Sequence, residues 1–268
     1  MIKRHRVEPG SRPRLAALDA GSTAGWSAGK EETEAAFADL GRRLRELQGR
    51  LWASRRRALL VVLQGMDTSG KDGTVSHVFE GVNPLGVRVA AWKAPSAEEL
   101  AHDFLWRIHA KAPGLGEMMI FNRSHYEDVL VARVHKLVPR KVWKRRYAQI
   151  NDFERLLDET GTTVLKFFLH IDRAEQKRRL EDRLADPHKR WKLQPSDLDD
   201  RKRWDDFVAA YEEAIRRTGT AEAPWYVVPA NKKWYRNLVV ASVLVHTLEG
   251  MHLRYPETPD ATRHIEIE

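Results

Sequence analysis

The sequence predicts an α/β fold in which a parallel five-stranded sheet lies between two layers of helices, as a three-layer αβα sandwich. Two observations lead to this prediction. Short apolar runs alternate with longer helical patterns along the chain, which is typical of a parallel sheet covered on both faces. In addition, the apolar run 59–64 is followed by a loop bounded by Gly65 and Gly70 and then by a helical pattern. This strand, loop and helix unit has the form G-x-x-x-x-G-K.

Length and composition set the limits of the prediction. A chain of 268 residues suits one large α/β domain, and a hydrophobic fraction of 42% is enough for a sizeable core. The mean hydropathy is −0.55 and no long apolar stretch occurs, so we expect no membrane span and no membrane partner. The sequence contains no cysteine, which excludes disulfides, thiolate metal sites and cysteine nucleophiles. No signal-peptide pattern opens the chain, and we expect a cytoplasmic protein.

We expect residues 1–268 to form a single domain with three additions to the sheet. Residues 1–30 are rich in Pro, Gly and Ser and are predicted to form an extended arm, either solvated or docked. A helix is expected over 31–55, because apolar residues recur there at three- or four-residue spacing: Ala36, Leu40, Leu44, Leu47 and Leu51. A helical lid is expected over about 173–200.

The other elements follow in order. Strands are expected over 59–64, 87–92, 118–121, 163–169 and 225–228. Helices are expected over about 73–82, 97–110, 124–136, 139–159, 173–185, 197–217 and 232–252. Ligands of such sheets bind beyond the carboxyl ends of the strands. The candidate site therefore draws on residues 65–74, 92–95, 121–128, 170–173 and 229–233.

The loop after the first strand has the chemistry of a phosphate site. Its two glycines permit backbone geometry in which successive N–H groups face one anion, and Lys71 adds a mobile positive charge. The next residue in such loops is usually Ser or Thr, but here it is Asp72. A carboxylate at a helix N-terminus is favoured in any case, so Asp72 has a structural explanation, and metal contact is the alternative. The predicted phosphate-binding residues of the loop are Gly65, Thr68, Ser69, Gly70, Lys71 and Asp72.

Asp67 lies inside this loop, where bound phosphates would repel its carboxylate unless a cation lay between them. Asp67 is therefore a candidate metal ligand or a base that acts on an incoming phosphate. The alternative is an Asp that stabilises the turn by accepting local N–H bonds.

Polar residues also follow the third strand. Asn122 stands where most phosphate-loop enzymes carry a metal-ordering Asp, so the metal charge must come from Asp67, Glu127 or Asp128. Arg123 would point into the cleft and clamp a transferring phosphate. The alternative for this stretch is a helix start, with Ser124 as N-cap and Glu127 closing a capping box. We assign Asn122, Arg123 and Glu127 to nucleotide binding.

Basic residues are concentrated in two further stretches. The net charge is +8 and the pI is about 9.7, which suits a polyanionic partner. Residues 129–151 contain no acid but seven cations, so this stretch is either a solvated face or a polyanion track: Arg133, Lys136, Arg140, Lys141, Lys144, Arg145 and Arg146. The segment 176–192 is basic and interrupted by Pro187, which suits a mobile lid, although a charged exposed helix gives the same pattern. Arg179 and Arg183 share one helix face.

The chain resembles the family 2 polyphosphate kinases over about residues 30 to 256. Three stretches carry the resemblance, namely 63–73 (LQGMDTSGKDG), 121–130 (FNRSHYEDVL) and 186–192 (DPHKRWK). The resemblance implies a thymidylate-kinase-like fold and transfer of a terminal phosphate between inorganic polyphosphate and nucleotides, with Mg²⁺ or Mn²⁺. The version of the motif with Asn122 is similar to that of the branch that acts on both AMP and ADP.

The resemblance also implies roles for individual residues. Asp67 and Asp128 would hold metal ions, with Asp67 helping to activate the acceptor phosphate. Lys71 and Arg123 would bind the transferring phosphates. The lid and polyphosphate channel would include four basic residues, Arg179, Arg183, Lys189 and Lys192. The catalytic residues are thus expected to be Asp67, Lys71, Arg123 and Asp128.

The leading hypothesis is a polyphosphate-dependent transferase that converts AMP to ADP and ADP to ATP, without a phosphoenzyme. Its expected partners are inorganic polyphosphate, AMP, ADP and ATP, with no nucleic acid, and the arm and exposed helices favour a homo-oligomer, either dimer or tetramer. One alternative is an ATP-dependent nucleotide kinase of the same fold. A second alternative is a basic nucleic-acid-binding protein with a vestigial phosphate loop.

Overall fold

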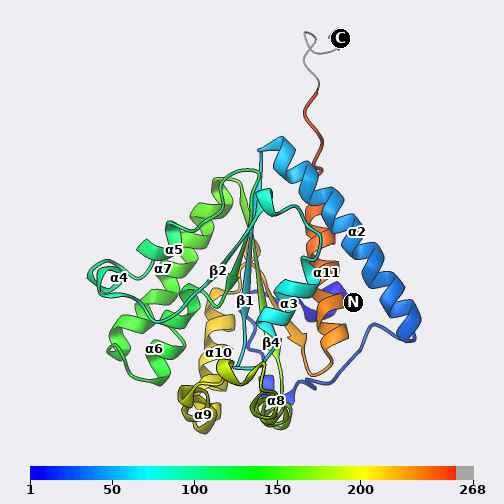
Figure 1. Ribbon diagram of the computed structural model, residues 1–268. Helices are drawn as coiled ribbons and strands as arrows, with labels where there is room; N and C mark the ends of the chain where they lie inside the picture. Colours follow the sequence, from blue (N-terminus) through cyan, green and yellow to red (C-terminus); the bar gives the residue numbers. More distant parts are fainter. Residues whose placement is uncertain (258–268) are drawn as a thin grey trace.

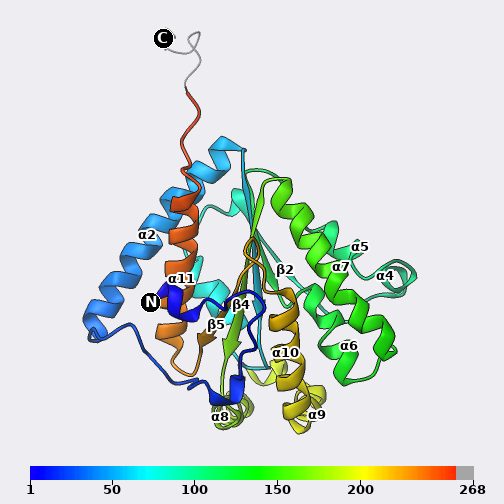
Figure 2. The same cartoon turned by 180° about the vertical axis from the view of Figure 1, so that it is seen from behind.

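A computed structural model of the protein describes residues 1–257, which form an all-parallel sheet with helices on both faces (Figures 1 and 2). The strand order is β2-β3-β1-β4-β5. The strands are β1 (Ala58–Gln64), β2 (Val87–Ala91), β3 (Met118–Asn122), β4 (Thr162–His170) and β5 (Trp225–Pro229). The predicted five-stranded parallel sheet is confirmed.

Strand β1 lies in the middle of the sheet, and all seven of its residues are buried. This burial explains why its sequence is continuously apolar rather than alternating. Leu63 is opposite Asn122 of β3 and opposite Phe167 of β4. The carboxyl ends of these three strands therefore meet at one edge of the sheet, which is the edge predicted to carry the site.

One face of the sheet is covered by α2 (Lys30–Ser54), α3 (Lys71–Val78) and α11 (Lys233–Gly250), with α1 (Ile2–His5) beside α11 (Figure 2). Helix α11 packs against α2, α3 and β5. In α2 the side chains of Leu44, Leu47 and Leu51 are buried, as their spacing predicts. This helix therefore covers the core.

The other face carries α7 (Arg140–Glu159) and α10 (Trp204–Thr218), with α6 (Val131–Val134) packed against both. Two short helices, α4 (Ala97–Ala101) and α5 (Trp106–His109), lie outside α7 (Figure 1). Helices α8 (Arg173–Ala185) and α9 (Pro195–Lys202) lie at the edge where the strands end (Figure 1). Short 3₁₀ turns span Leu15–Ala17, Pro84–Gly86, His125–Asp128 and Arg190–Lys192.

The N-terminal arm is docked on the domain rather than solvated. The imidazole of His5 lies 2.9 Å from the Tyr235 hydroxyl of α11, and the Val7 N–H donates to the Trp225 carbonyl of β5. Leu15 is buried, so the arm contributes an apolar side chain to the core. Of the two possibilities left open by the sequence, the structure shows the docked one.

Three segments expected as single helices are interrupted in the structure. The predicted helix 97–110 is two helices, because the Asp103 carboxylate accepts a hydrogen bond from the Leu105 N–H and makes a local turn. The predicted helix 197–217 is also two helices, since the chain breaks at Arg203, whose guanidinium donates to the Val134 carbonyl 2.9 Å away.

The third interruption lies in the predicted helix 124–136. The Ser124 hydroxyl accepts from the Tyr126 N–H and begins a 3₁₀ turn rather than an α-helix. Of the alternative explanation for this stretch, Ser124 is the N-cap as expected, but the capping box does not form, because the Glu127 carboxylate lies 3.9 Å from the Arg123 guanidinium instead of returning to Ser124. Within residues 1–257, no helix is apolar over a length sufficient to cross a bilayer.

Candidate active site

The predicted phosphate loop joins β1 to α3. Gly65 opens it with a φ of 153°, and a Cβ at this position would lie 2.7 Å from the Leu169 carbonyl oxygen of β4. Gly70 closes it with a φ of 101°, directly before Lys71 begins α3. Both positions therefore need glycine. The free N–H groups at the start of α3 follow at once, which suits an anion.

The interior of the loop contains polar groups that suit a phosphate. The Lys71 ammonium is buried and donates to the carbonyl oxygens of Gly65 and Met66, at 2.8 and 3.2 Å. Burial and the nearby Arg123 lower the pKa of Lys71. The hydroxyls of Thr68 and Ser69 are buried and have no hydrogen-bond partner within the described chain. Unpaired buried hydroxyls are costly unless a ligand completes them, so the loop fits a bound anion.

Arg123 links the loop to the turn after β3. Its guanidinium donates to the Asp67 carboxylate at 2.7 Å and lies 3.9 Å from that of Glu127. Its φ of 62° is unusual for a residue with a side chain, and such strain occurs often at functional sites. Glu127 is the first cause of the raised pKa of Arg123, and burial raises the pKa of Glu127. The structure thus brings these three predicted residues together.

A pocket beside these residues is lined by carboxylates from three separate segments of the chain. Asp67, Glu127 and Asp200 line it, and Asp200 was not predicted from the sequence. Burial, followed by the charge of Asp67, raises the pKa of Asp200. The sequence feature that could have indicated Asp200 is the acidic stretch at the start of α9, although this stretch matches no motif. The pocket is lined by Gly65, Met66, Asp67, Arg123, Glu127, Val131, Gln176, Asp200, Phe207 and Tyr211.

Asp72 connects the loop to β3 and to the lid. Its carboxylate accepts a hydrogen bond from the Asn122 amide at 2.8 Å and lies 3.1 Å from the Lys192 ammonium. Partial burial opposes ionisation, but these two donors hold the pKa of Asp72 below its usual value. Asp72 is therefore ionised at neutral pH and ties the 3₁₀ turn Arg190–Lys192 to the start of α3.

Asp128 does not line the pocket that Asp67 lines. Its carboxylate accepts from the Arg146 guanidinium of α7 at 3.0 Å, and burial raises its pKa. Among residues 1–257, no three His, Asp or Glu side chains converge as a metal site. The structure therefore places Asp67 of the phosphate loop beside Arg123 and leaves Asp128 paired with Arg146.

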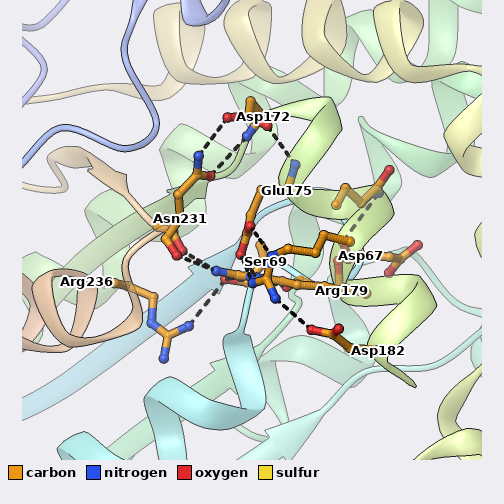
Figure 3. A network of polar contacts seen from close by, with 12 residues as sticks. Asp67, Ser69, Asp172, Glu175, Arg179, Asp182, Asn231 and Arg236 are labelled. Atoms are coloured by element: carbon orange, nitrogen blue, oxygen red, sulfur yellow. Dashed lines mark hydrogen bonds and ion pairs between the residues drawn. The ribbon is translucent and has the colours of Figure 1, made fainter. Parts of the chain in front are cut away.

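The basic residues of the predicted lid divide into two kinds. Arg179 is buried, and its guanidinium donates to the Thr68 and Ser69 carbonyls of the loop at 2.9 and 3.1 Å (Figure 3). It also donates to the Ala230 carbonyl and pairs with Glu175 at 2.6 Å. Arg179 thus supports the loop backbone rather than extending into the cleft.

The other predicted lid residues are more exposed. Arg183 donates to the Lys192 carbonyl at 3.3 Å and lies 3.6 Å from the Asp197 carboxylate. Lys189 is exposed and pairs with Asp186. These contacts join α8, the turn after it and α9 into one unit. Lys192 reaches the start of α3 through its contact with Asp72.

A buried polar network supports the turn that carries Arg123. Glu154 of α7 accepts from the Tyr126 hydroxyl at 2.8 Å and lies 3.2 Å from the His125 imidazole. Lys166 of β4 pairs with the same carboxylate and donates to the Thr218 carbonyl. All members of the network are buried. Removing one partner would leave a buried charge unpaired, so the network fixes this turn firmly.

The fold and the site together define a phosphate-loop phosphotransferase. Its phosphate loop, with a buried Lys71 and two unpaired hydroxyls, lies beside Arg123 and three carboxylates at the carboxyl edge of a parallel sheet. The chain belongs to the polyphosphate kinase 2 family, whose model matches residues 27–256. The predicted family is confirmed.

Individual relatives agree with this assignment. The chain is 53% identical to an AMP/ADP-polyphosphate phosphotransferase of Meiothermus ruber, over 100% of both chains. It is 43% identical to an ADP-polyphosphate phosphotransferase of Rhodopseudomonas palustris, over 82% of this chain and 81% of the relative. The crystal structure of polyphosphate kinase 2 from Arthrobacter aurescens TC1 is 46% identical, with a TM-score of 0.93, covering 97% of this chain and 94% of the other.

Proposed function

We propose that the protein transfers the terminal phosphate of inorganic polyphosphate to AMP and to ADP, which gives ADP and ATP. The main support for this proposal is the full-length similarity to an AMP/ADP-polyphosphate phosphotransferase. The phosphate loop supports it, because its buried lysine and unpaired hydroxyls suit a phosphate chain. Asp72 supports it as well, since the hydroxyl that ordinarily serves a metal bound to ATP is replaced.

In the reaction, a phosphate oxygen of the acceptor nucleotide attacks the terminal phosphorus of the chain. A new P–O bond forms to the nucleotide, the P–O bond to the chain breaks, and the shortened chain leaves with the electron pair. Lys71 and Arg123 would stabilise the charge that accumulates on the transferring group. Asn122 and Glu127 would position the acceptor beside Arg123. The protein contributes mainly position and charge, so no covalent intermediate is needed.

Mg²⁺ or Mn²⁺ is the cofactor that we propose. Carboxylate oxygens are the ligands that these ions prefer, and Asp67, Glu127 and Asp200 line the pocket. Because these side chains do not converge as a three-ligand site within residues 1–257, oxygens of the bound phosphates would complete the ligand set. Burial and then the charge of Asp67 raise the pKa of Asp200, and a bound cation would oppose both effects. When bound, the ion would neutralise charge on the phosphates. Asp128 would join as a ligand only by exchanging its contact with Arg146.

The rest of the polyphosphate chain needs cations outside the loop. In the basic stretch, Arg133 pairs with Glu213 and Arg146 pairs with Asp128. The other five cations of the stretch are exposed at the start of α7 and just before it: Lys136, Arg140, Lys141, Lys144 and Arg145. We propose that these five residues, with Lys189 and Lys192 of the lid, hold the distal part of the chain.

The test is an incubation with AMP, Mg²⁺ and long-chain polyphosphate in the absence of ATP. We expect ADP to form first and ATP to follow, and initial rates with AMP and ADP at fixed polyphosphate give the acceptor preference. A parallel incubation with ATP as the donor tests the alternative of an ATP-dependent nucleotide kinase. Transfer from ATP alone, with none from polyphosphate, would contradict the proposal.

A further inference from the structure

A second arginine contacts the phosphate loop from within the protein. Arg236 is near the start of α11, and its side chain is only 2% exposed. Its guanidinium lies 3.4 Å from the Ser69 carbonyl oxygen, which also accepts from Arg179 (Figure 3). The space at Gly70 is filled by this side chain, because a Cβ there would lie 1.8 Å from an Arg236 nitrogen. Two buried guanidinium groups therefore share one loop carbonyl.

The two arginines differ in charge balance. Arg179 is paired with Glu175 at 2.6 Å, so its charge is compensated inside the protein. Arg236 donates to the neutral Asn237 side chain at 2.8 and 3.1 Å, and no carboxylate of residues 1–257 forms an ion pair with it. Burial, followed by the charge of Arg179, lowers the pKa of Arg236 to about 10. At neutral pH, Arg236 thus remains a buried cation without a counter-ion, which is costly for the folded state.

Arg236 can influence phosphate binding because it contacts the Ser69 carbonyl on one side of the Ser69–Gly70 peptide. The carbonyl of Ser69 and the N–H of Gly70 belong to one planar trans peptide, so they point in opposite directions. When the arginines hold the carbonyl, the Gly70 N–H faces away from them, where a phosphate oxygen can accept it. The charge of Arg236 then lies directly behind that peptide, and its missing counter-ion would be the phosphate chain itself.

We propose that Arg236 is a positioning residue for the phosphate loop, which orients the Ser69–Gly70 peptide and supplies the buried positive charge that a bound polyphosphate compensates. This inference rests on the proposed function and goes beyond it. It implies that the protein gives up folding stability in the free state in order to bind a phosphate chain more tightly. A residue with a purely structural role would instead stabilise the free state.

The experiment compares Arg236→Gln and Arg236→Lys with the wild-type protein. Arg43→Gln is the matched control, because Arg43 pairs at the surface with Glu249 near the other end of α11 and does not contact the loop. Thermal unfolding is measured without ligand and with tripolyphosphate as the probe, in the absence of nucleotide. Steady-state rates with AMP then give the KM for polyphosphate and for AMP separately.

For R236Q we expect an unliganded Tm equal to or above that of the wild type, and a smaller rise in Tm with tripolyphosphate. We expect its KM for polyphosphate to rise roughly tenfold, since hydrogen bonds of charged groups contribute on this scale, while the KM for AMP changes much less. R236K should recover part of the tripolyphosphate shift because it keeps the charge. R43Q should match the wild type in both measurements.

The proposal is overturned if R236Q fails to fold. A second contradicting result is an R236Q that folds with a lower unliganded Tm while its tripolyphosphate shift stays at the wild-type value. The proposal is also overturned if R236K behaves no better than R236Q in binding tripolyphosphate. These results are distinguishable from failure of the proposed function, because in that case the wild-type protein itself would transfer no phosphate from polyphosphate to AMP.

Discussion

At the scale of single residues, the site contains some polar groups that are hydrogen-bonded within the protein and others that have no partner there. The Asp67 carboxylate is held by Arg123 at 2.7 Å, whereas the Thr68 and Ser69 hydroxyls are buried without partners. Lys71 is bound to two loop carbonyls, which are contacts that it can exchange for phosphate oxygens. The site therefore has its charges in place before a substrate binds.

We predict that Lys71→Ala and Asp67→Asn each reduce the transfer rate by at least about a hundredfold, the scale expected when a group that stabilises the transferring charge is lost. Both variants should remain folded, because neither side chain is part of the hydrophobic core. Steady-state rates with AMP and polyphosphate, together with circular dichroism, measure both outcomes. Substantial turnover in either folded variant would show that the assignment of these residues is incorrect.

The residues also show where reasoning from the sequence reaches its limit. The phosphate loop and the place of Arg123 directly after β3 were predictable, because local spacing and strand ends specify them. The burial of Arg179 was not predictable. The helix face that it shares with Arg183 does not reveal that its guanidinium donates to carbonyls of the loop. Asp200 was missed because it reaches the pocket only through the packing of α9.

At the scale of elements, the lid and the phosphate loop are linked by polar contacts. Arg179 joins α8 to the loop backbone, and Lys192 of the following turn pairs with Asp72 of α3. The strands were predictable because buried apolar runs are continuous in a parallel sheet. The helix break at Arg203 was not predictable, since it accompanies a long-range contact with Val134 rather than a local turn signal.

We predict that Lys192→Ala raises the KM for polyphosphate severalfold and leaves the Tm nearly unchanged. The Lys192 and Asp72 side chains are 36% and 64% exposed, and exposed ion pairs contribute at most about 1 kcal/mol to stability. A phosphate chain near the loop would lose a cation, however. Thermal unfolding and polyphosphate titrations of the rate test both parts, with Lys202→Ala as a control that removes an exposed lysine paired within α9. Equal KM values for K192A, K202A and the wild type would remove Lys192 from the polyphosphate channel.

At the scale of the whole molecule, the positive charge is unevenly balanced. The cations at the start of α7 are exposed, and α6 just before them is tied to the lid side of the site by the His135–Asp200 contact of 2.6 Å. The Val134 carbonyl accepts from Arg203, which adds a second link. These two contacts join the segment just before the basic surface to α9 and Arg203, and Asp200 of α9 lines the pocket. The predicted homo-oligomer remains a prediction.

We predict that this basic surface serves long chains and not short ones. A variant that replaces four of its cations with Gln should show a KM for long-chain polyphosphate raised at least severalfold and a weaker salt dependence, because fewer screened contacts remain: Lys136, Arg140, Lys141 and Lys144. Its KM for tripolyphosphate should stay near the wild-type value, since we expect the phosphate loop alone to hold so short a chain. The control replaces four exposed cations elsewhere with Gln, which lowers the net charge equally: Arg12, Arg14, Arg42 and Arg45. If both variants weaken long-chain binding to the same degree, net charge alone attracts the polymer and the proposed track along α7 does not exist.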